Sequence, residues 1–233
     1  MAASFPPPPP LLLLLANGAA LLLPAQALNQ DGLHLLDAKR ALTVPAPALD
    51  DWNPRDDTPC NWTGVACHDH DGAVAAISLP SLNLAGSFPA ALCRIPGLRS
   101  IDLSDNYIGP DLDSNNFSGP IPEPFARFTK LQSLSLVYNL LGGKVPPFLG
   151  RVATLRELNL SYNPFAPGPV PPQLGDLSAL RVLWLAGCNL VGTIPPSLGR
   201  LTNLTDLDLS TNALTDPIPP EITGLTSAVQ IEL

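Results

Sequence analysis

Apolar and polar residues alternate along most of the chain with one recurring spacing. Aligned segments begin at Val74, Leu98, Leu131, Leu155, Leu180, Leu204 and Ala228. The repeat length is nearly constant, at about 24 residues, and only the step from Leu98 to Leu131 is much longer. The most regular segment, LQSLSLVYNLLGGKVPPFLGRVAT, begins at Leu131 and follows the pattern LxxLxLxxNxLxGx(I/V)PxxLGx(L/V). One such segment cannot bury its apolar side chains alone, so the repeat predicts a solenoid of stacked coils.

Each half of the repeat predicts its own local structure. In the Leu131 segment, Leu134 and Leu136 alternate with serines, which is typical of a short, half-buried strand. After the glycines and Pro146, Leu149 belongs to a predicted short helical or 3₁₀ segment. The strands of successive coils should form one parallel sheet on the concave side of an α/β solenoid.

An asparagine follows most of the predicted strands at a fixed offset. A buried amide can both donate to and accept from the backbone of neighbouring coils, so these residues predict a ladder through the solenoid. Leu82 occupies the offset in the first coil, and cysteine is a known alternative there, so Cys188 is predicted to be structural and not a nucleophile. The later ladder positions are Asn106, Asn139, Asn163, Cys188 and Asn212.

One coil, residues 98–130, is irregular. Residues 98–110 fit the first places of a coil, and residues 111–130 fit the fifth place to the last, which puts Asn115 at a second ladder position. The whole segment is longer than one coil and shorter than two, so a partial loss from two coils and a short insertion into one both fit its length. We favour the loss, because repeat proteins tolerate changes of whole units. The surplus should bulge or form a second strand through Leu112.

Residues 28–73 have a different pattern and predict an N-terminal cap for the solenoid. DGLHLLDAKRAL predicts a short helix with Asp31 near its start and an apolar face of Leu33, Leu35 and Leu36. In the following DDWNPRDDTPCNWTGVAC, Cys60 and Cys67 predict a local disulfide. Trp52 and Trp62 are predicted to cover the open end of the first coil.

Residues 1–27 predict a secretory signal peptide. The apolar stretch 11–23 precedes Ala25-Gln26-Ala27, which resembles a cleavage site. A membrane anchor is the alternative, but this stretch is short for a span of about 20 residues. With no other apolar segment of that length, the chain after cleavage at Ala27 is expected to be secreted and not inserted in a membrane. Residues 74–233 then hold about six coils and a partial one, without a C-terminal cap.

Composition narrows the function classes. The formal net charge of −8 and the absence of Lys/Arg clusters argue against nucleic-acid binding. No enzymatic motif is present, and the His68–Asp71 cluster HDHD is more typical of a solvated loop than of a metal site, so no metal or cofactor is expected. Four N-x-(S/T) sequences, which are plausible glycosylation sites in a secreted chain, lie at Asn61, Asn116, Asn159 and Asn203.

The outward positions of the predicted concave strands are the candidate ligand-binding site. Exposed aromatic side chains are frequent binding anchors, and the acidic residues would suit a basic peptide. The alternative is that the carboxylates only keep the sheet soluble. Trp184 is the strongest candidate. The full predicted set is Asp102, Asp105, Tyr138, Glu157, Tyr162, Trp184, Asp206 and Asp208.

The cap LNQDGLHLLDAKRAL…DDWNPRDDTPCNWTGVAC, followed by LxGxIP-type coils, resembles the start of the ectodomain of plant leucine-rich-repeat receptor-like kinases. VLWLAGCNLVGTIPPSLGRLTNL resembles the HAESA-type group in particular. The resemblance implies a right-handed superhelix, a secreted peptide hormone on the inner face and a co-receptor ectodomain as partner. Family members continue into a membrane span and a kinase, whereas this sequence ends at VQIEL, so we expect no enzymatic activity. A secreted cell-wall inhibitor of a polysaccharide-degrading enzyme is the alternative function.

Cys93 has two interpretations. Cys188 lies about four coils, or about 20 Å, away, beyond the Cα separation of about 7 Å that a disulfide allows. Related receptors carry a second cysteine in the next coil, so a partner of Cys93 was lost with the missing residues of the irregular coil, or Cys93 packs as a small apolar residue.

Overall fold

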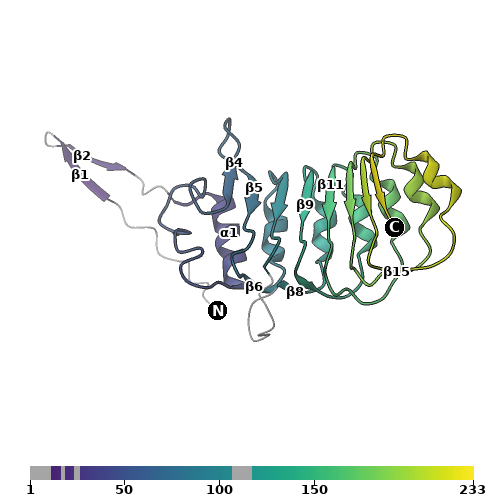
Figure 1. The fold of residues 1–233 in the computed structure, drawn as a ribbon. Helices are drawn as coiled ribbons and strands as arrows, with labels where there is room; N and C mark the ends of the chain where they lie inside the picture. Colours follow the sequence, from purple (N-terminus) through teal and green to yellow (C-terminus); the bar gives the residue numbers. More distant parts are fainter. Residues whose placement is uncertain (1–11, 17–18, 24–26, 107–116) are drawn as a thin grey trace, which may run out of the picture.

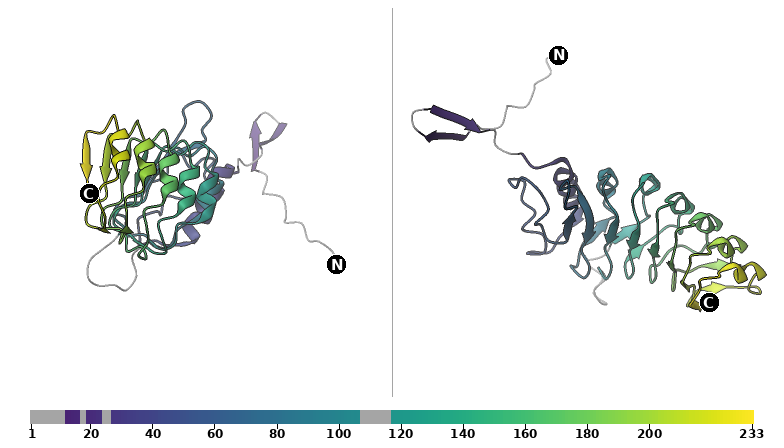
Figure 2. Two further views of the ribbon diagram at one scale, coloured as in Figure 1. Left: turned by 90° about the vertical axis from the view of Figure 1, so that its right-hand side faces the viewer. Right: turned by 90° about the horizontal axis from the view of Figure 1, so that it is seen from above.

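The chain is a curved solenoid behind an N-terminal cap (Figure 1). The computed structural model describes residues 12–16, 19–23, 27–106 and 117–233. Strands line the concave side of the arc and 3₁₀ turns line the convex side, as the view from above shows (Figure 2). Strands β1 (Leu12–Ala16) and β2 (Ala19–Leu23) pair as an antiparallel hairpin. In the described part of the chain, no helix is long and apolar enough to span a membrane.

The cap is built on helix α1 (Gln30–Arg40). Asn29 caps it, since its side chain accepts from the Gly32 N–H at 2.9 Å. The predicted apolar face was wrong in one residue: Leu35 is fully buried, but Leu33 is 45% exposed. Two steps along a helix turn the side chain by about 200°, so both leucines cannot face the core. Asp31 accepts from the Val74 N–H at 2.9 Å and so ties the helix to the first coil.

The predicted disulfide and tryptophan cover are confirmed. Cys60 and Cys67 are bonded, with their Cα atoms 5.5 Å apart. The buried rings of Trp52 and Trp62 stack at 5.5 Å. The Trp62 indole N–H also donates to Asp56 at 2.7 Å, so its polar edge is paired as burial requires. Both rings belong to the same apolar core as the first coil.

One sheet runs along the whole concave side. Its order is β16-β14-β12-β11-β9-β7-β5-β4, and every pair is parallel except the antiparallel pair of β4 and β5. Its strands are β4 (Val65–Cys67), β5 (Val74–Ser78), β7 (Ser100–Asp102), β9 (Ser133–Ser135), β11 (Glu157–Asn159), β12 (Val182–Trp184), β14 (Asp206–Asp208) and β16 (Gln230–Glu232). The predicted solenoid with its parallel concave sheet is confirmed.

A second, shorter set of strands follows the concave strands, and a 3₁₀ turn closes each coil. The short strands are β3 (Leu42–Thr43), β6 (Ala85–Ser87), β8 (Phe117–Gly119), β10 (Leu140–Leu141), β13 (Val191–Gly192) and β15 (Ala213–Leu214). The 3₁₀ turns are η1 (Ala90–Arg94), η2 (Glu123–Arg127), η3 (Pro147–Arg151), η4 (Pro172–Asp176), η5 (Pro196–Arg200) and η6 (Pro220–Gly224).

These short strands form two separate sheets, β10-β8-β6-β3 and β13-β15. The division falls in the Leu155 coil, where only an isolated bridge joins Gly168 to Leu190. This coil has one more residue than its neighbours, within PFAPGPVPP. The extra residue and the prolines, which cannot donate to a ladder, account for the missing strand.

The asparagine ladder is confirmed. The Asn163 amide nitrogen donates to the carbonyls of Leu136 at 2.8 Å and Leu160 at 2.9 Å, and its oxygen accepts from the Leu141 N–H at 3.0 Å. Cys188 takes the same place with its thiol, which donates to the Leu160 carbonyl at 3.2 Å. Each ladder residue therefore joins its own turn to a neighbouring coil.

Among the described residues, the irregular coil supplies one strand, β7, to the concave sheet. Strand β7 pairs directly with β9, Ser100 opposite Ser133, so no second strand through Leu112 enters between them. Leu112 itself and the second ladder position at Asn115 lie outside the described residues. The irregular coil also affects the coil that follows it. The buried Asn139 side-chain oxygen has no hydrogen-bond donor in the part of the chain that the structure describes.

Candidate functional site

The eight predicted ligand-binding residues fall into three rows on the concave side. The strand register places Glu157 and Asp206 in a first row, near the starts of the strands. Asp102, Trp184 and Asp208 lie in a second row, at the strand ends. We call the third the turn row, because its members follow the strands and have left-handed backbones. The turn row is Asp105, Tyr138, Tyr162, Gly187 and Thr211, with φ between 53° and 60°.

Two of the second-row carboxylates support the backbone. Asp208 accepts from the Ser210 N–H at 2.9 Å and from the Ser210 hydroxyl at 2.6 Å. Asp102 makes the same pair of contacts with Ser104, at 3.1 and 2.6 Å. Such local bonds hold the turn after each strand. Some of the carboxylates on this face therefore stabilise the backbone. The alternative interpretation of the carboxylates assigned them only a role in solubility.

Trp184 is the aromatic side chain of the second row. It is 41% exposed at the end of β12. Its register partners are Asn159 on β11 and Asp208 on β14, so it stands between two polar neighbours. A large indole surface left open to solvent on a polar sheet is available for a ligand.

Tyr138 and Tyr162 form a stacked pair in the turn row. Their ring centroids are 4.5 Å apart and their planes differ by 3°. Backbone bonds fix the spacing, since the Tyr138 N–H donates to Ser161 at 3.1 Å and the Tyr162 N–H to Ala186 at 2.7 Å. Both rings remain partly exposed, at 45% and 43%. They line a hollow of about 300 Å³ together with Asn139, Leu140, Asn163, Pro164, Gly187 and Asn189.

Gly187 is a member of the candidate site that the sequence reasoning missed. A Cβ atom at Gly187 would lie 2.9 Å from a ring carbon of Tyr162, so only glycine lets this ring lie against the backbone. The repeat alignment could have identified it, because Gly187 occupies the same position in its coil as Tyr138 and Tyr162 occupy in their coils.

The ring neighbour and two carboxylates act on the Tyr162 hydroxyl. The neighbouring Tyr138 is the main cause that raises the pKa of Tyr162 above its ordinary value, with further contributions from burial and from the carboxylates of Asp208 and Glu232. The hydroxyl of Tyr162 therefore stays protonated to higher pH than a free tyrosine, and it can donate a hydrogen bond.

The predicted glycosylation residues occupy different surroundings. Asn61 is exposed in the cap and Asn203 is exposed beyond η5. Asn159 lies half-buried in the second row, and its side-chain oxygen accepts from the Ser161 N–H at 3.0 Å. Asn116 is outside the described residues. A glycan on Asn159 would therefore stand on the concave face beside Trp184.

The remaining candidate chemistry is structural where it is described. Within residues 12–16, 19–23, 27–106 and 117–233, no group of three His, Cys, Asp or Glu residues could hold a metal ion. His68 approaches the Gly97 carbonyl at 3.2 Å. Cys93 and Cys188 are free thiols, and burial raises the pKa of each to about 12. Neither is therefore a thiolate at neutral pH.

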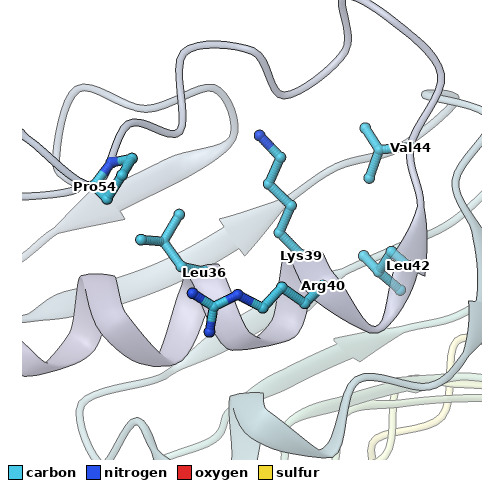
Figure 3. A pocket seen from close by; sticks show the side chains of 6 residues that line it. All are labelled: Leu36, Lys39, Arg40, Leu42, Val44 and Pro54. Carbon is cyan, nitrogen blue, oxygen red and sulfur yellow. The ribbon is translucent and has the colours of Figure 1, made fainter.

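A second hollow, of about 410 Å³, lies on the cap (Figure 3). It is lined by Leu36, Lys39, Arg40, Leu42, Val44 and Pro54. Its cations already have partners: Lys39 donates to the Leu49 carbonyl at 2.5 Å, and Arg40 pairs with Asp37 at 2.7 Å. Asp37 also pairs with Arg94 of η1 at 2.8 Å, so this region helps join the cap to the first coil.

Comparison with known proteins agrees with this architecture. The family model for the leucine rich repeat N-terminal domain matches residues 28–68, and the Leucine Rich Repeat model matches residues 154–177, 179–201 and 203–225. Receptor-like protein kinase 5 of Arabidopsis thaliana is 42% identical over 96 residues, which are 41% of this chain and 10% of the relative. The aligned part thus spans about a tenth of the length of that curated relative.

Two solved structures of Arabidopsis receptor kinases are similar over most of the chain. The ectodomain of GASSHO1/SCHENGEN3, in complex with CASPARIAN STRIP INTEGRITY FACTOR 2, has a TM-score of 0.76 and 36% identity, and the match covers 85% of this chain and 23% of that one. HAESA, in complex with the peptide hormone IDA and the co-receptor SERK1, has a TM-score of 0.54 and 42% identity, covering 88% and 41%. With its cap, disulfide and repeat, the chain belongs to the family of plant leucine-rich-repeat receptor-like kinase ectodomains.

Proposed function

We propose that the concave face binds a secreted peptide. The observation that carries the proposal is the set of exposed aromatic rings on the concave side, Trp184 at the end of β12 and Tyr138 and Tyr162 in the turns after β9 and β11. Aromatic side chains lose little conformational entropy on binding and dominate the energetics of many interfaces. The peptide complexes of HAESA and GASSHO1/SCHENGEN3 support the choice of ligand class.

The three rows suit an extended chain lying across the strands. Trp184 stands at the strand ends and the tyrosine pair follows in the turns, so one ligand can contact both. Glu157 and Asp206 in the first row face the same side of the sheet. We assign the ligand-binding role to the predicted set as a whole, with Trp184 as the anchor. A co-receptor ectodomain is the further partner, by likeness to the HAESA complex with SERK1.

The proposal includes the location of the chain. We infer that residues 1–27 are removed as a signal peptide and that the chain acts outside the cell, where the Cys60–Cys67 disulfide is stable. Asn61 and Asn203 would then receive glycans, because both are exposed. N-terminal sequencing of the secreted product tests this part, since cleavage after Ala27 leaves Leu28 as the first residue.

The test of binding is a Trp184→Ala variant measured by calorimetry against a panel of synthetic hydroxyproline-containing peptides. Loss of an anchor should weaken binding by about 2 kcal/mol, or about thirtyfold. Leu33→Ala is the matched control, because Leu33 is similarly exposed but lies on the cap. Unchanged affinity of Trp184→Ala would remove the concave face as the site. Binding to polysaccharide-degrading enzymes but not to peptides would favour the alternative, an inhibitor of such enzymes.

A further inference from the structure

The two ends of the tyrosine stack are different. On one side of Tyr162, the Gly187 backbone approaches the ring so closely that a Cβ atom would lie 2.9 Å away. That face is closed. On the other side of the pair, the preceding member of the turn row is Asp105, whose N–H donates to the Val137 carbonyl at 2.9 Å. An aspartate side chain is too short to cover a tyrosine ring, and Tyr138 is 45% exposed, so among the described residues the turn row leaves the outer face of Tyr138 uncovered.

Asp105 is available to a ligand. Its side chain is exposed, and among the residues that the structure describes it accepts no hydrogen bond and forms no ion pair. This distinguishes it from Asp102 and Asp208, whose carboxylates hold turns. The open ring face and the unpaired carboxylate are neighbours in adjacent coils of the turn row.

Charge across the sheet favours a cation at this end. Arg99, Arg156 and Arg181 directly precede β7, β11 and β12, and all three are exposed. Glu157 and Asp206 lie beside them, so the edge at the strand starts is mixed in charge, whereas the opposite edge carries Asp102, Asp105 and Asp208. A cationic group of a ligand is therefore attracted more strongly to the second edge than to the first.

From these observations we propose that the outer face of Tyr138 and the carboxylate of Asp105 bind the guanidinium group of an arginine side chain. A guanidinium is planar, so it stacks on a tyrosine ring and presents two N–H groups to one carboxylate at the same time. An ammonium group has no plane to stack on the ring and contacts the carboxylate as a point charge, without two parallel N–H groups. The inference rests on the proposed peptide-binding function and names the side chain that the turn row selects.

The probe is the tripeptide Ac-Gly-Arg-Gly-NH₂, titrated into the full chain with ¹³C-labelled tyrosine and followed by the ring signals in NMR spectra. Its citrulline counterpart has the same shape without the charge, and its lysine counterpart has the charge without the plane. We expect citrulline to bind about tenfold more weakly than arginine, and lysine in between. Equal affinities for arginine and citrulline would overturn the proposal.

Variants locate the site. Asp105→Asn and Tyr138→Ala should each weaken binding of the arginine probe about fivefold to tenfold. Asp69→Asn, which removes another exposed charge in the cap loop, should leave binding of the probe unchanged. Unchanged binding in both turn-row variants would also overturn the proposal. These outcomes can be distinguished from those of the Trp184→Ala experiment. If the long peptides bind through Trp184 but the arginine tripeptide does not bind, only the arginine subsite is contradicted. If the arginine tripeptide binds but the long peptides do not, only the proposed function is contradicted.

Discussion

The buried oxygen of Asn139 allows a sharp test of the ladder. Asn139→Ala and Asn163→Ala make the same chemical change at equivalent places in adjacent coils. In each variant the main carbonyl acceptors keep another donor. The Leu136 carbonyl accepts from both asparagines, so it keeps one of them in either variant. The Leu103 carbonyl also accepts from the Asn106 amide, and the Leu160 carbonyl also accepts from the Cys188 thiol. The lost amide donors therefore cost about the same in both variants.

The difference lies in the amide oxygens. Asn163→Ala leaves the buried Leu141 N–H without its acceptor, which costs about 1–3 kcal/mol. Asn139→Ala instead removes an oxygen that has no donor among the described residues, which should recover a similar amount. Asn163→Ala should thus lower the free energy of unfolding by at least about 2 kcal/mol more than Asn139→Ala. This is a difference of about thirtyfold in the unfolding equilibrium constant.

Urea unfolding of the full chain, followed by far-UV circular dichroism and tryptophan fluorescence, measures both free energies. Equal slopes against urea in the two variants are needed, because they show that the same surface is exposed on unfolding. If Asn139→Ala proved as destabilising as Asn163→Ala, the Asn139 oxygen would have a partner and the account of the irregular coil would be wrong.

Three other perturbations have defined outcomes. Because the folded-state pKa values of Cys93 and Cys188 are raised to about 12 from an ordinary value of about 9, their contribution to stability should be complete below pH 9 and lost as the pH rises to 12. Urea unfolding between pH 9 and pH 12 should show a smaller decrease in the free energy of unfolding for Cys188→Ala than for the unsubstituted chain, and an identical decrease would contradict this prediction. Gly187→Ala should cost at least about 1 kcal/mol and disturb the tyrosine stack in near-UV spectra, whereas Gly192→Ala, also at positive φ but in open space, should leave the stack intact. Chains that carry a glycan on Asn159 should bind the peptide panel more weakly than Asn159→Gln, which binding before and after glycosidase treatment would check.

The repeat made the solenoid predictable from sequence, because period-two alternation and a fixed asparagine offset permit few other structures. Leu134 and Leu136 are buried and Asn163 bonds both neighbouring turns, as their spacing indicated. Leu33 shows the limit in the cap. Three nearby leucines suggest a broad apolar face, but only contact with the first coil decides which one is buried.

The residues of the candidate site could be predicted from the sequence, but the contacts between them could not. Sequence offsets placed Tyr138 and Tyr162 on the exposed side, and both are exposed. The two rings stack in parallel, and Gly187 closes one ring face. Both features depend on a left-handed backbone at these positions, which the residue types alone do not predict. The structural bonds of Asp102 likewise became visible only when Ser104 was in place.

The divided second sheet has a mechanical consequence. On the concave side, parallel strands join all the coils without interruption, whereas on the other side the Leu155 coil has no short strand and is joined to its neighbours by the bridge from Gly168 to Leu190 and by the Ala166 N–H, which donates to the Gly143 carbonyl. Fewer backbone hydrogen bonds therefore resist bending on that side of the Leu155 coil than between coils whose short strands pair. The arc can change its curvature there while its inner strands remain paired. Tyr162 and Trp184 lie on this coil and the next, so a ligand across them would span the interruption of the second sheet.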